Sequence, residues 1–214
     1  MKSALVVFVK APVPGKVKTR LSPPLKPEES AQLYTAFLKD SYSQYTQLKD
    51  VDLFYFYSGD IALLNALLPK QEYWEKQSDG DLGDRIISAF NSILRRYKKC
   101  VIVGSDHPDL PLSYLKKAFS VLDYVDVSVG PSDDGGYYCI GLKKVYPSLF
   151  TQMEWSVNTV FLETQRRISQ EDLESFTLPE WYDIDTITDL KRFSKNYIKS
   201  VFPNTAKELS ELSL

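Results

Sequence analysis

The sequence predicts an α/β protein with one mainly parallel sheet covered by helices on both faces. Two observations carry this prediction: short β-branched or aromatic runs alternate with amphipathic segments, and no internal repeat or low-complexity linker interrupts them. The 214 residues, 43% of them hydrophobic, are enough for one sizeable core. We therefore expect residues 1–214 to form a single domain, with a helical tail over residues 200–214.

The first half of the chain alternates strands with helices. Residues 3–9 form an apolar run typical of a strand buried on both faces, and residues 28–48 repeat apolar side chains at helical spacing. The aromatic run 51–57 predicts a second strand. A short helix over 61–68 stopped by Pro69, a helix over 82–97 and a strand over 100–103 follow.

The second half repeats this unit and then changes character. We predict a helix over 113–122, a strand over 125–129, a strand over 137–142 after a turn cluster, and helices over 155–168 and 187–197. Ligands of such sheets bind beyond the carboxyl ends of the strands. The loops after Val9, Val103 and Val129 are therefore the places to look for a site.

Composition argues against some partners and compartments. A formal net charge of -2 gives no long-range attraction to polyanions, so we expect no nucleic-acid partner. The apolar stretch 4–9 is too short for a signal sequence or membrane span. Cys100 and Cys139 form no CxxC pair, which favours two buried thiols in a reducing compartment. We expect a cytoplasmic protein.

The loop after the first predicted strand has a phosphate-binding composition. It gathers Lys10, Lys16, Lys18 and Arg20, while Gly15 permits close backbone approach. The GxxxxGK[ST] spacing of a P-loop is absent, and a solvated basic surface loop is the alternative interpretation.

The loop after the strand over 100–103 offers carboxylates for a cation. Asp106 is the first-choice ligand for Mg²⁺ or Mn²⁺, which prefer oxygen donors, and Ser105 is a candidate phosphate-binding residue. Asp109 either binds the ligand or caps the next turn or helix. We expect no direct chemical role for His107, the only histidine.

Two further glycine-rich segments are candidates for ligand contact. Asp133 and Asp134 precede a double glycine and are candidates for orienting or deprotonating an acceptor, although a plain hairpin turn explains them too. Gly80, Asp81 and Arg85 surround the start of a predicted helix, whose free N–H groups favour an anion; a plain helix cap is the alternative.

Two late carboxylates, Asp183 and Asp185, precede the helix predicted over 187–197. One is expected to cap that helix and the other to be a second metal ligand.

These segments together resemble the glycosyltransferase-A-like family of radical-SAM/selenodomain-associated transferases of type 1, a domain family of unknown function. The resemblance runs over residues 2–195 and rests on FVKAPVPGKVKTRL, GDLGDR, VGSDHPDLP, GPSDDGGYYCIGL, EWS before a helix, and DIDTITDL. It implies the Rossmann-like fold of nucleotide-diphospho-sugar transferases, with Asp106 and Asp185 as the metal pair. The KTRL stretch at residues 18–21 also resembles the first loop of phospholactate guanylyltransferases.

The preferred hypothesis is a metal-dependent glycosyltransferase that uses a nucleotide-sugar donor and an unidentified small-molecule acceptor. Lys16, Lys18 and Arg20 would neutralise phosphate charge, and Asp134 would orient or deprotonate the acceptor. A nucleotidyltransferase that uses a nucleoside triphosphate and releases pyrophosphate stays open, as do a non-catalytic nucleotide-binding module and a hydrolase of activated nucleotides. The sequence does not predict the oligomeric state.

Overall fold

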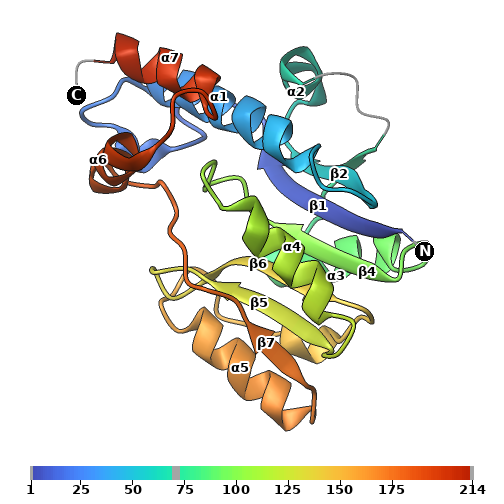
Figure 1. The fold of residues 1–214 in the computed structure, drawn as a ribbon. Coiled ribbons are helices and arrows are strands. Elements are labelled where there is room, and N and C mark those ends of the chain that lie inside the picture. The colour runs from blue at the N-terminus through green and yellow to red at the C-terminus, as the bar shows by residue number, and fades with distance from the viewer. Residues whose placement is uncertain (1, 69–72, 213–214) are drawn as a thin grey trace.

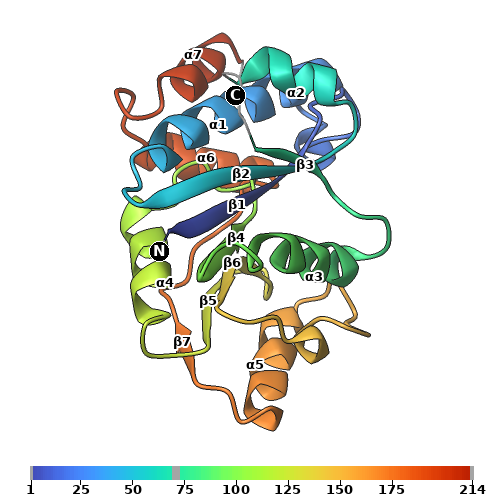
Figure 2. The ribbon, with the colours of Figure 1, turned by 90° about the vertical axis from the view of Figure 1, so that its right-hand side faces the viewer.

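A computed structural model describes residues 2–68 and 73–212, which contain one sheet of order β3-β2-β1-β4-β6-β5-β7 (Figures 1 and 2). Strand β6 runs antiparallel to β4 and β5, and the other neighbouring strands pair in parallel. The predicted fold class, a mainly parallel sheet in an α/β protein, is confirmed. The strands are β1 Ser3–Lys10, β2 Val51–Ser58, β3 Trp74–Lys76, β4 Lys99–Val103, β5 Val127–Pro131, β6 Tyr137–Leu142 and β7 Ser175–Thr177.

Helices cover both faces of the sheet (Figure 2). In β1, Leu5 and Val7 pack with α1, α4 and α6, whereas Ala4 and Val6 pack with α3 and α5 on the opposite face. This alternation of fully buried side chains explains the continuous apolar run of β1. The helices are α1 Pro27–Tyr45, α2 Ile61–Leu67, α3 Leu82–Ile93, α4 Leu112–Val121, α5 Val160–Gln170, α6 Ile187–Asn196 and α7 Pro203–Glu211, with short 3-10 turns η1 Thr19–Leu21 and η2 Pro147–Leu149.

Several predicted boundaries were wrong by a few residues. Helix α1 ends at Tyr45 because Gln47 and Leu48 bond to carbonyls three residues back, a tightening common at helix ends. Helix α3 ends early for the same reason, since Arg96 bonds to the carbonyl of Ile93. Helix α5 begins five residues later than 155, because Ser156 has a φ of 65° that no α-helix accommodates.

Other differences concern the sheet. Strand β5 begins at Val127 because the Val125 N–H closes the turn after α4 on the carbonyl of Val121. The three-residue strands β3 and β7 were not predicted, since each is too short to show a period. Pro69, predicted to stop α2, lies outside the described residues.

The carboxylate of Asp40, fully buried in α1, fixes the start of α7. It accepts hydrogen bonds from the backbone N–H groups of Asn204 at 3.2 Å and Thr205 at 2.8 Å, and from both side chains. Elsewhere, Cys100 and Cys139 are free and buried, as predicted. No helix among the described residues combines the length and apolar character needed to cross a membrane.

Candidate functional site

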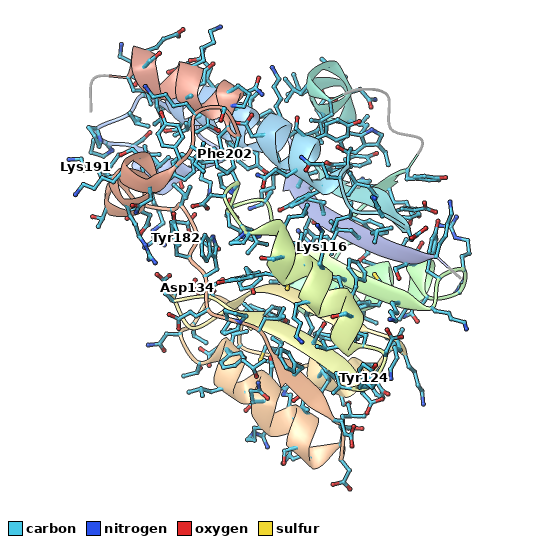
Figure 3. All side chains as sticks on the ribbon, viewed as in Figure 1. Lys116, Tyr124, Asp134, Tyr182, Lys191 and Phe202 are labelled. Atoms are coloured by element: carbon cyan, nitrogen blue, oxygen red, sulfur yellow. The ribbon has the colours of Figure 1, made fainter. Side chains whose placement is uncertain are left out.

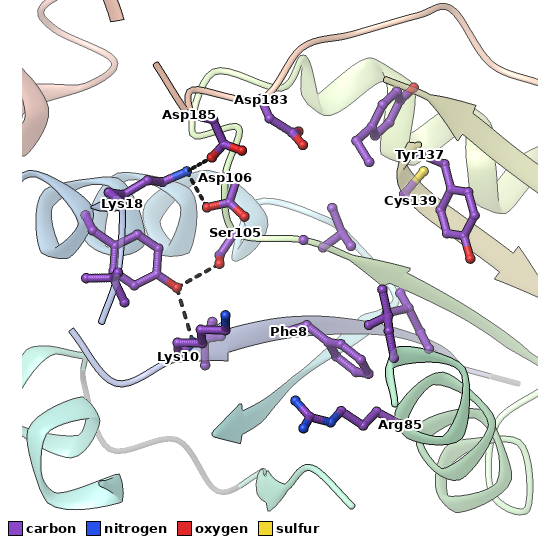
Figure 4. A pocket seen from close by; sticks show the side chains of 18 of the residues that line it. Phe8, Lys10, Lys18, Arg85, Ser105, Asp106, Tyr137, Cys139, Asp183 and Asp185 are labelled. Carbon is purple, nitrogen blue, oxygen red and sulfur yellow. Dashed lines mark hydrogen bonds and ion pairs between the residues drawn. The ribbon is translucent and has the colours of Figure 1, made fainter. Parts of the chain in front are cut away.

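A cavity of about 630 Å³ opens where β1 and β4 end and where the antiparallel β6 begins (Figure 4). The loops after β1 and β4 and the segment before α6 all contribute to its walls. This is the position expected for a ligand of an α/β sheet. Predicted site residues that line the cavity are Lys10, Lys16, Lys18, Arg20, Arg85, Ser105, Asp106 and Asp185.

Lys18 is the centre of an ion-pair cluster at this cavity. Its Nζ pairs with Oδ1 of Asp106 and, at 3.0 Å, with Oδ1 of Asp185 (Figure 4). The Lys18 side chain is only 2% exposed and its backbone adopts a left-handed φ of 46°, which is uncommon for a lysine. Arg20 adds a weaker pair, with Nη1 3.6 Å from the other oxygen of Asp185. Two carboxylates far apart in sequence therefore converge on one cation.

The charges of this cluster stabilise one another. Burial alone would lower the pKa of Lys18, but the pairs with Asp106 and Asp185 outweigh it and raise the pKa above its ordinary value. Burial likewise acts to raise the pKa of Asp106, yet the charge and hydrogen bond of Lys18 lower it below the ordinary value of 3.8. Lys18 and Asp106 are thus ionised together at neutral pH.

Tyr34 of α1 braces the two loops that meet at the cavity. The backbone N–H of Lys10 donates to the Tyr34 hydroxyl at 3.2 Å, and that hydroxyl lies 2.8 Å from Oγ of Ser105. Burial raises the pKa of Tyr34 to about 12, so the hydroxyl keeps its proton. A buried tyrosine needs a hydrogen-bond partner for its hydroxyl, and here the Lys10 N–H and the Ser105 hydroxyl are those partners.

Backbone and side-chain bonds fasten the late acidic segment to the loop after β4. The Ile184 N–H donates to the carbonyl of Asp106 at 2.8 Å, which places Asp185 opposite that residue. Asp109 accepts from Nε1 of Trp181 at 3.3 Å and from the hydroxyl of Tyr182 at 2.5 Å. Asp109 therefore fixes the segment of Trp181 and Tyr182 through hydrogen bonds and does not cap α4.

His107, which is buried, pairs with the partly exposed Asp183 beside the cavity. Nδ1 of His107 lies 3.2 Å from Oδ1 of Asp183, and the His107 side chain is 2% exposed. Asp183 also lines the cavity, and His107 contacts one of its two carboxylate oxygens. The expected helix cap was wrong, because Thr186 caps α6 in place of Asp183 or Asp185.

Some predicted site residues lie away from the cavity walls. Asp133 pairs with Arg192 at 2.9 Å, and Asp134 accepts from Oγ of Ser132 and the N–H of Gly136 within its own turn. Figure 3 shows Asp134 near the segment that carries Tyr182. These contacts are those of a turn, and the acceptor role of both aspartates stays a prediction.

The glycines and one aspartate also have structural explanations. Asp81 caps α3 by accepting from the Asp84 N–H at 2.9 Å, next to Gly80 with a φ of 100°. Gly15 turns the basic loop at a φ of 73°. Among Gly80, Asp81 and Arg85, the residue that lines the cavity is Arg85.

The donor set at the cavity fits a hard divalent cation. Asp106 and Asp185 already converge on a positive charge, and carboxylates are the protein ligands that Mg²⁺ and Mn²⁺ prefer. Within residues 2–68 and 73–212 no three His, Cys, Asp or Glu side chains are placed to hold a metal together. A two-carboxylate site suits an ion that completes its coordination with water and phosphate.

Comparisons with solved structures identify the fold. The chain is 33% identical to the "putative nucleotide-diphospho-sugar transferase" from Desulfovibrio desulfuricans G20, covering 98% of this chain and 96% of that one with a TM-score of 0.90. CMP:2-keto-3-deoxy-manno-octonic acid synthetase complexed with CTP matches at 12% identity and a TM-score of 0.60, covering 99% of this chain and 100% of that one. Rv0371C from Mycobacterium tuberculosis H37Rv complexed with manganese matches at 13% identity and a TM-score of 0.58, covering 92% of this chain and 100% of that one.

The last two likenesses, at low identity, show the shared fold alone. A comparison with curated proteins finds no match. The sequence profile of DUF2064, described as an uncharacterized protein conserved in bacteria, matches residues 42–157, more than half of the chain. The likeness to the Desulfovibrio desulfuricans structure covers 98% of the chain and therefore extends beyond residues 42–157. This chain belongs to the DUF2064 family and has the nucleotide-diphospho-sugar transferase fold.

Proposed function

We propose that this protein is a metal-dependent transferase that takes a nucleotide sugar as its donor. The observation that carries the proposal is the convergence of Asp106 and Asp185 on one cation, at the wall of a cavity that Lys10 and Lys16 also line. Paired carboxylates beside phosphate-binding cations are the arrangement through which proteins bind a metal–nucleotide complex. The relative at 33% identity, which is described as a putative nucleotide-diphospho-sugar transferase, supports the same reaction class.

In this proposal, acidic residues bind the metal and basic residues bind the phosphates. Asp106 and Asp185 would hold Mg²⁺ or Mn²⁺, which when bound supplies Lewis-acid stabilisation of charge on the phosphate oxygens. Lys10, Lys16 and Arg20 neutralise the phosphates directly, and Ser105, braced by Tyr34, offers a hydroxyl beside them.

Asp183 is the carboxylate that we propose for contact with the acceptor. It lines the cavity, and His107 holds one of its oxygens, so the second oxygen can accept a hydrogen bond from an acceptor hydroxyl. In the transfer, that hydroxyl gives its proton to Asp183, and its oxygen bonds to the anomeric carbon of the sugar. The bond from this carbon to the diphosphate oxygen breaks, and the nucleoside diphosphate leaves with the electron pair.

A nucleotidyltransferase is the second candidate, favoured by the number of cations in the loop after β1. An acceptor would then attack the α-phosphorus of a nucleoside triphosphate and release pyrophosphate. The structural neighbour complexed with CTP shows that this fold accommodates a triphosphate. The description of the relative at 33% identity nevertheless favours a sugar donor. We therefore place glycosyl transfer first.

Product analysis tests the proposal and separates the two reactions. The protein is incubated with Mn²⁺, a panel of nucleotide sugars or nucleoside triphosphates, and a bacterial small-molecule extract as the source of acceptor. Release of a nucleoside diphosphate with a new glycoside supports glycosyl transfer. Release of pyrophosphate with a nucleotidylated product supports the second candidate, and nucleoside diphosphate release without a glycoside indicates hydrolysis.

Two matched variants link any product to the site. Asp185→Asn removes a carboxylate from the cavity, and we expect it to abolish product formation. Asp81→Asn changes a carboxylate outside the cavity and keeps a good helix cap, so its activity should match wild type. Metal-dependent nucleotide binding without any product would contradict catalysis and favour a binding module.

A further inference from the structure

Lys18 is a buried cation to which the mechanism proposed above gives no task. Its side chain is 2% exposed, whereas the two carboxylates that it contacts, those of Asp106 and Asp185, are 45% and 37% exposed. Figure 4 shows the ammonium group of Lys18 between these two carboxylates. Lysine is almost never fully buried unless it is paired, so the charge of Lys18 depends on these two partners.

The backbone on either side of Lys18 is fixed in the core. Val17 and Leu21 are buried and belong to the same hydrophobic cluster as residues of β1 and α1. The Leu21 N–H donates to the carbonyl of Lys18 at 3.0 Å, which closes the turn of η1. Because both flanking residues are buried, the backbone of Lys18 stays in place. Any new partner of its ammonium group therefore has to lie within reach of the side chain, at the cavity.

A metal ion held by Asp106 and Asp185 competes with Lys18 for the same oxygens. Nζ of Lys18 pairs with Oδ1 of each carboxylate, and within residues 2–68 and 73–212 it pairs with no other acid. Arg20 contacts the other oxygen of Asp185 and is 70% exposed, so it can turn to solvent or to a phosphate. Lys18 is buried, and an unpaired charge is costly to bury. Metal binding by itself therefore leaves Lys18 without a partner.

A phosphate group supplies the partner that Lys18 then lacks. Lys18 lines the cavity together with Lys10 and Lys16, two of the cations that the proposed function assigns to the phosphates. An ammonium group is a compact charge with three donors on a flexible stem, and it pairs with phosphate oxygens as well as with carboxylates. A diphosphate that binds the same metal ion brings such oxygens next to the two aspartates. Nζ of Lys18 can therefore change partner through a movement of its side chain alone.

We propose that Lys18 is a transferable counter-ion that couples the binding of the metal to the binding of the diphosphate. In the free protein its ammonium group neutralises Asp106 and Asp185. When metal and diphosphate bind together, the ammonium group passes to a phosphate oxygen, so every charged group keeps an opposite partner. The metal alone leaves Lys18 unpaired and is held weakly, so the site selects the metal–diphosphate complex. This inference deepens the proposed function and rests on it, because it requires both ligands in the cavity.

The test is a linkage measurement with Mn²⁺ and inorganic pyrophosphate. Calorimetry gives the dissociation constant of pyrophosphate without metal and at saturating Mn²⁺, and the ratio of the two constants is the coupling factor. It is measured for wild type, Lys18→Met and the matched control Lys16→Met. Mn²⁺ and pyrophosphate also associate in solution, but that contribution is identical for the three proteins and cancels when their coupling factors are compared.

We expect the coupling factor of wild type to exceed that of Lys18→Met by at least about 5-fold, which is the worth of one ion pair at a solvent-exposed site. Lys16→Met removes a cation from the same cavity that makes no ion pair with a described residue. It should weaken pyrophosphate binding equally with and without metal and keep the coupling factor of wild type. Lys18→Gln, whose neutral amide can still donate to the carboxylates, should lose the coupling too and serves if Lys18→Met does not fold.

Two results overturn the inference. Equal coupling factors in all three proteins mean that Lys18 either stays on the carboxylates or is expelled without reaching a phosphate. A loss of coupling as large in Lys16→Met as in Lys18→Met means that the effect is one of general charge and not of a change of partner.

The outcomes separate this inference from the function on which it depends. If Mn²⁺ does not strengthen pyrophosphate binding to wild type beyond the association of the two in solution, the proposed function fails and the coupling by Lys18 fails with it. If Mn²⁺ strengthens that binding by the same factor in all three proteins, the role of Lys18 alone is wrong and the metal–phosphate site stands.

Discussion

Replacing Lys18 by methionine should strengthen metal binding in the absence of nucleotide. Lys18 is 2% exposed, whereas its partners Asp106 and Asp185 are 45% and 37% exposed, so solvent screens both ion pairs. Each such pair is worth about 1 kcal/mol. A metal ion that takes both carboxylates must replace the two pairs, at a cost of about 2 kcal/mol, which corresponds to about 30-fold in the binding constant.

Lys18→Met removes this competition while keeping an unbranched apolar stem. We therefore predict that Mn²⁺ binds Lys18→Met about 30-fold more tightly than wild type. Titration of the apo-protein with Mn²⁺, followed by calorimetry or by the electron paramagnetic resonance signal of the free ion, measures the difference.

Lys16→Met is the matched control. Lys16 belongs to the same loop, lines the same cavity and makes no ion pair with any described residue. Lys16→Met changes the net charge by the same amount as Lys18→Met. A general effect of charge would therefore raise the Mn²⁺ affinity equally in both variants, whereas direct competition predicts a much larger rise for Lys18→Met. Equal gains, or no gain in Lys18→Met, would refute the reasoning.

Three further predictions concern stability. Asp40→Ala should cost about 3 kcal/mol, because four hydrogen bonds to the start of α7 are lost, and hydrogen exchange should show α7 opening first. Gly135→Ala should cost about 2 kcal/mol or more in thermal unfolding, since φ is +89° and an added Cβ lies 2.0 Å from a carbonyl oxygen; Gly15→Ala, with open space, should cost less. The lowered pKa of Asp106 contributes stability that is present above pH 3.8 and is lost as pH falls through the folded pKa, so acid titration of Lys18→Met should lack this loss.

Elements with a clear period or a strong breaker were predictable. The strands β1 and β6 show as apolar runs, and α1, α3 and α6 show as amphipathic repeats. Their ends were less predictable, because the last turns of α1 and α3 tighten through contacts that no sequence pattern encodes. The edge strands β3 and β7 depend on pairing with a neighbour and carry no signal of their own.

Most residues of the site could be predicted from the sequence, but the ion pairs that they form with one another could not. Loops after parallel strands gave Asp106 and the basic residues, and the family resemblance added Asp185. The sequence placed Lys18 among phosphate-binding groups, whereas in the structure it bridges the two carboxylates. That arrangement depends on a left-handed backbone at Lys18 and on the clamp of Asp109 with Tyr182, both of which are tertiary features.

For Asp133 and Asp134, the sequence pattern is compatible with two different structures. An acidic pair before two glycines has the same appearance in a turn as in a ligand-binding loop. The bonds of Asp134 to Ser132 and Gly136 show a turn, and the acceptor role of the pair stays a prediction.

The most direct test of the central claim is manganese anomalous diffraction from crystals that contain Mn²⁺ and the nucleotide that binds most tightly. The account predicts an anomalous peak coordinated by the carboxylates of Asp106 and Asp185, with phosphate oxygens on the same ion and Lys18 no longer bridging the pair. A nucleotide bound in the cavity while Lys18 still bridges both carboxylates, with no peak between them, would contradict it.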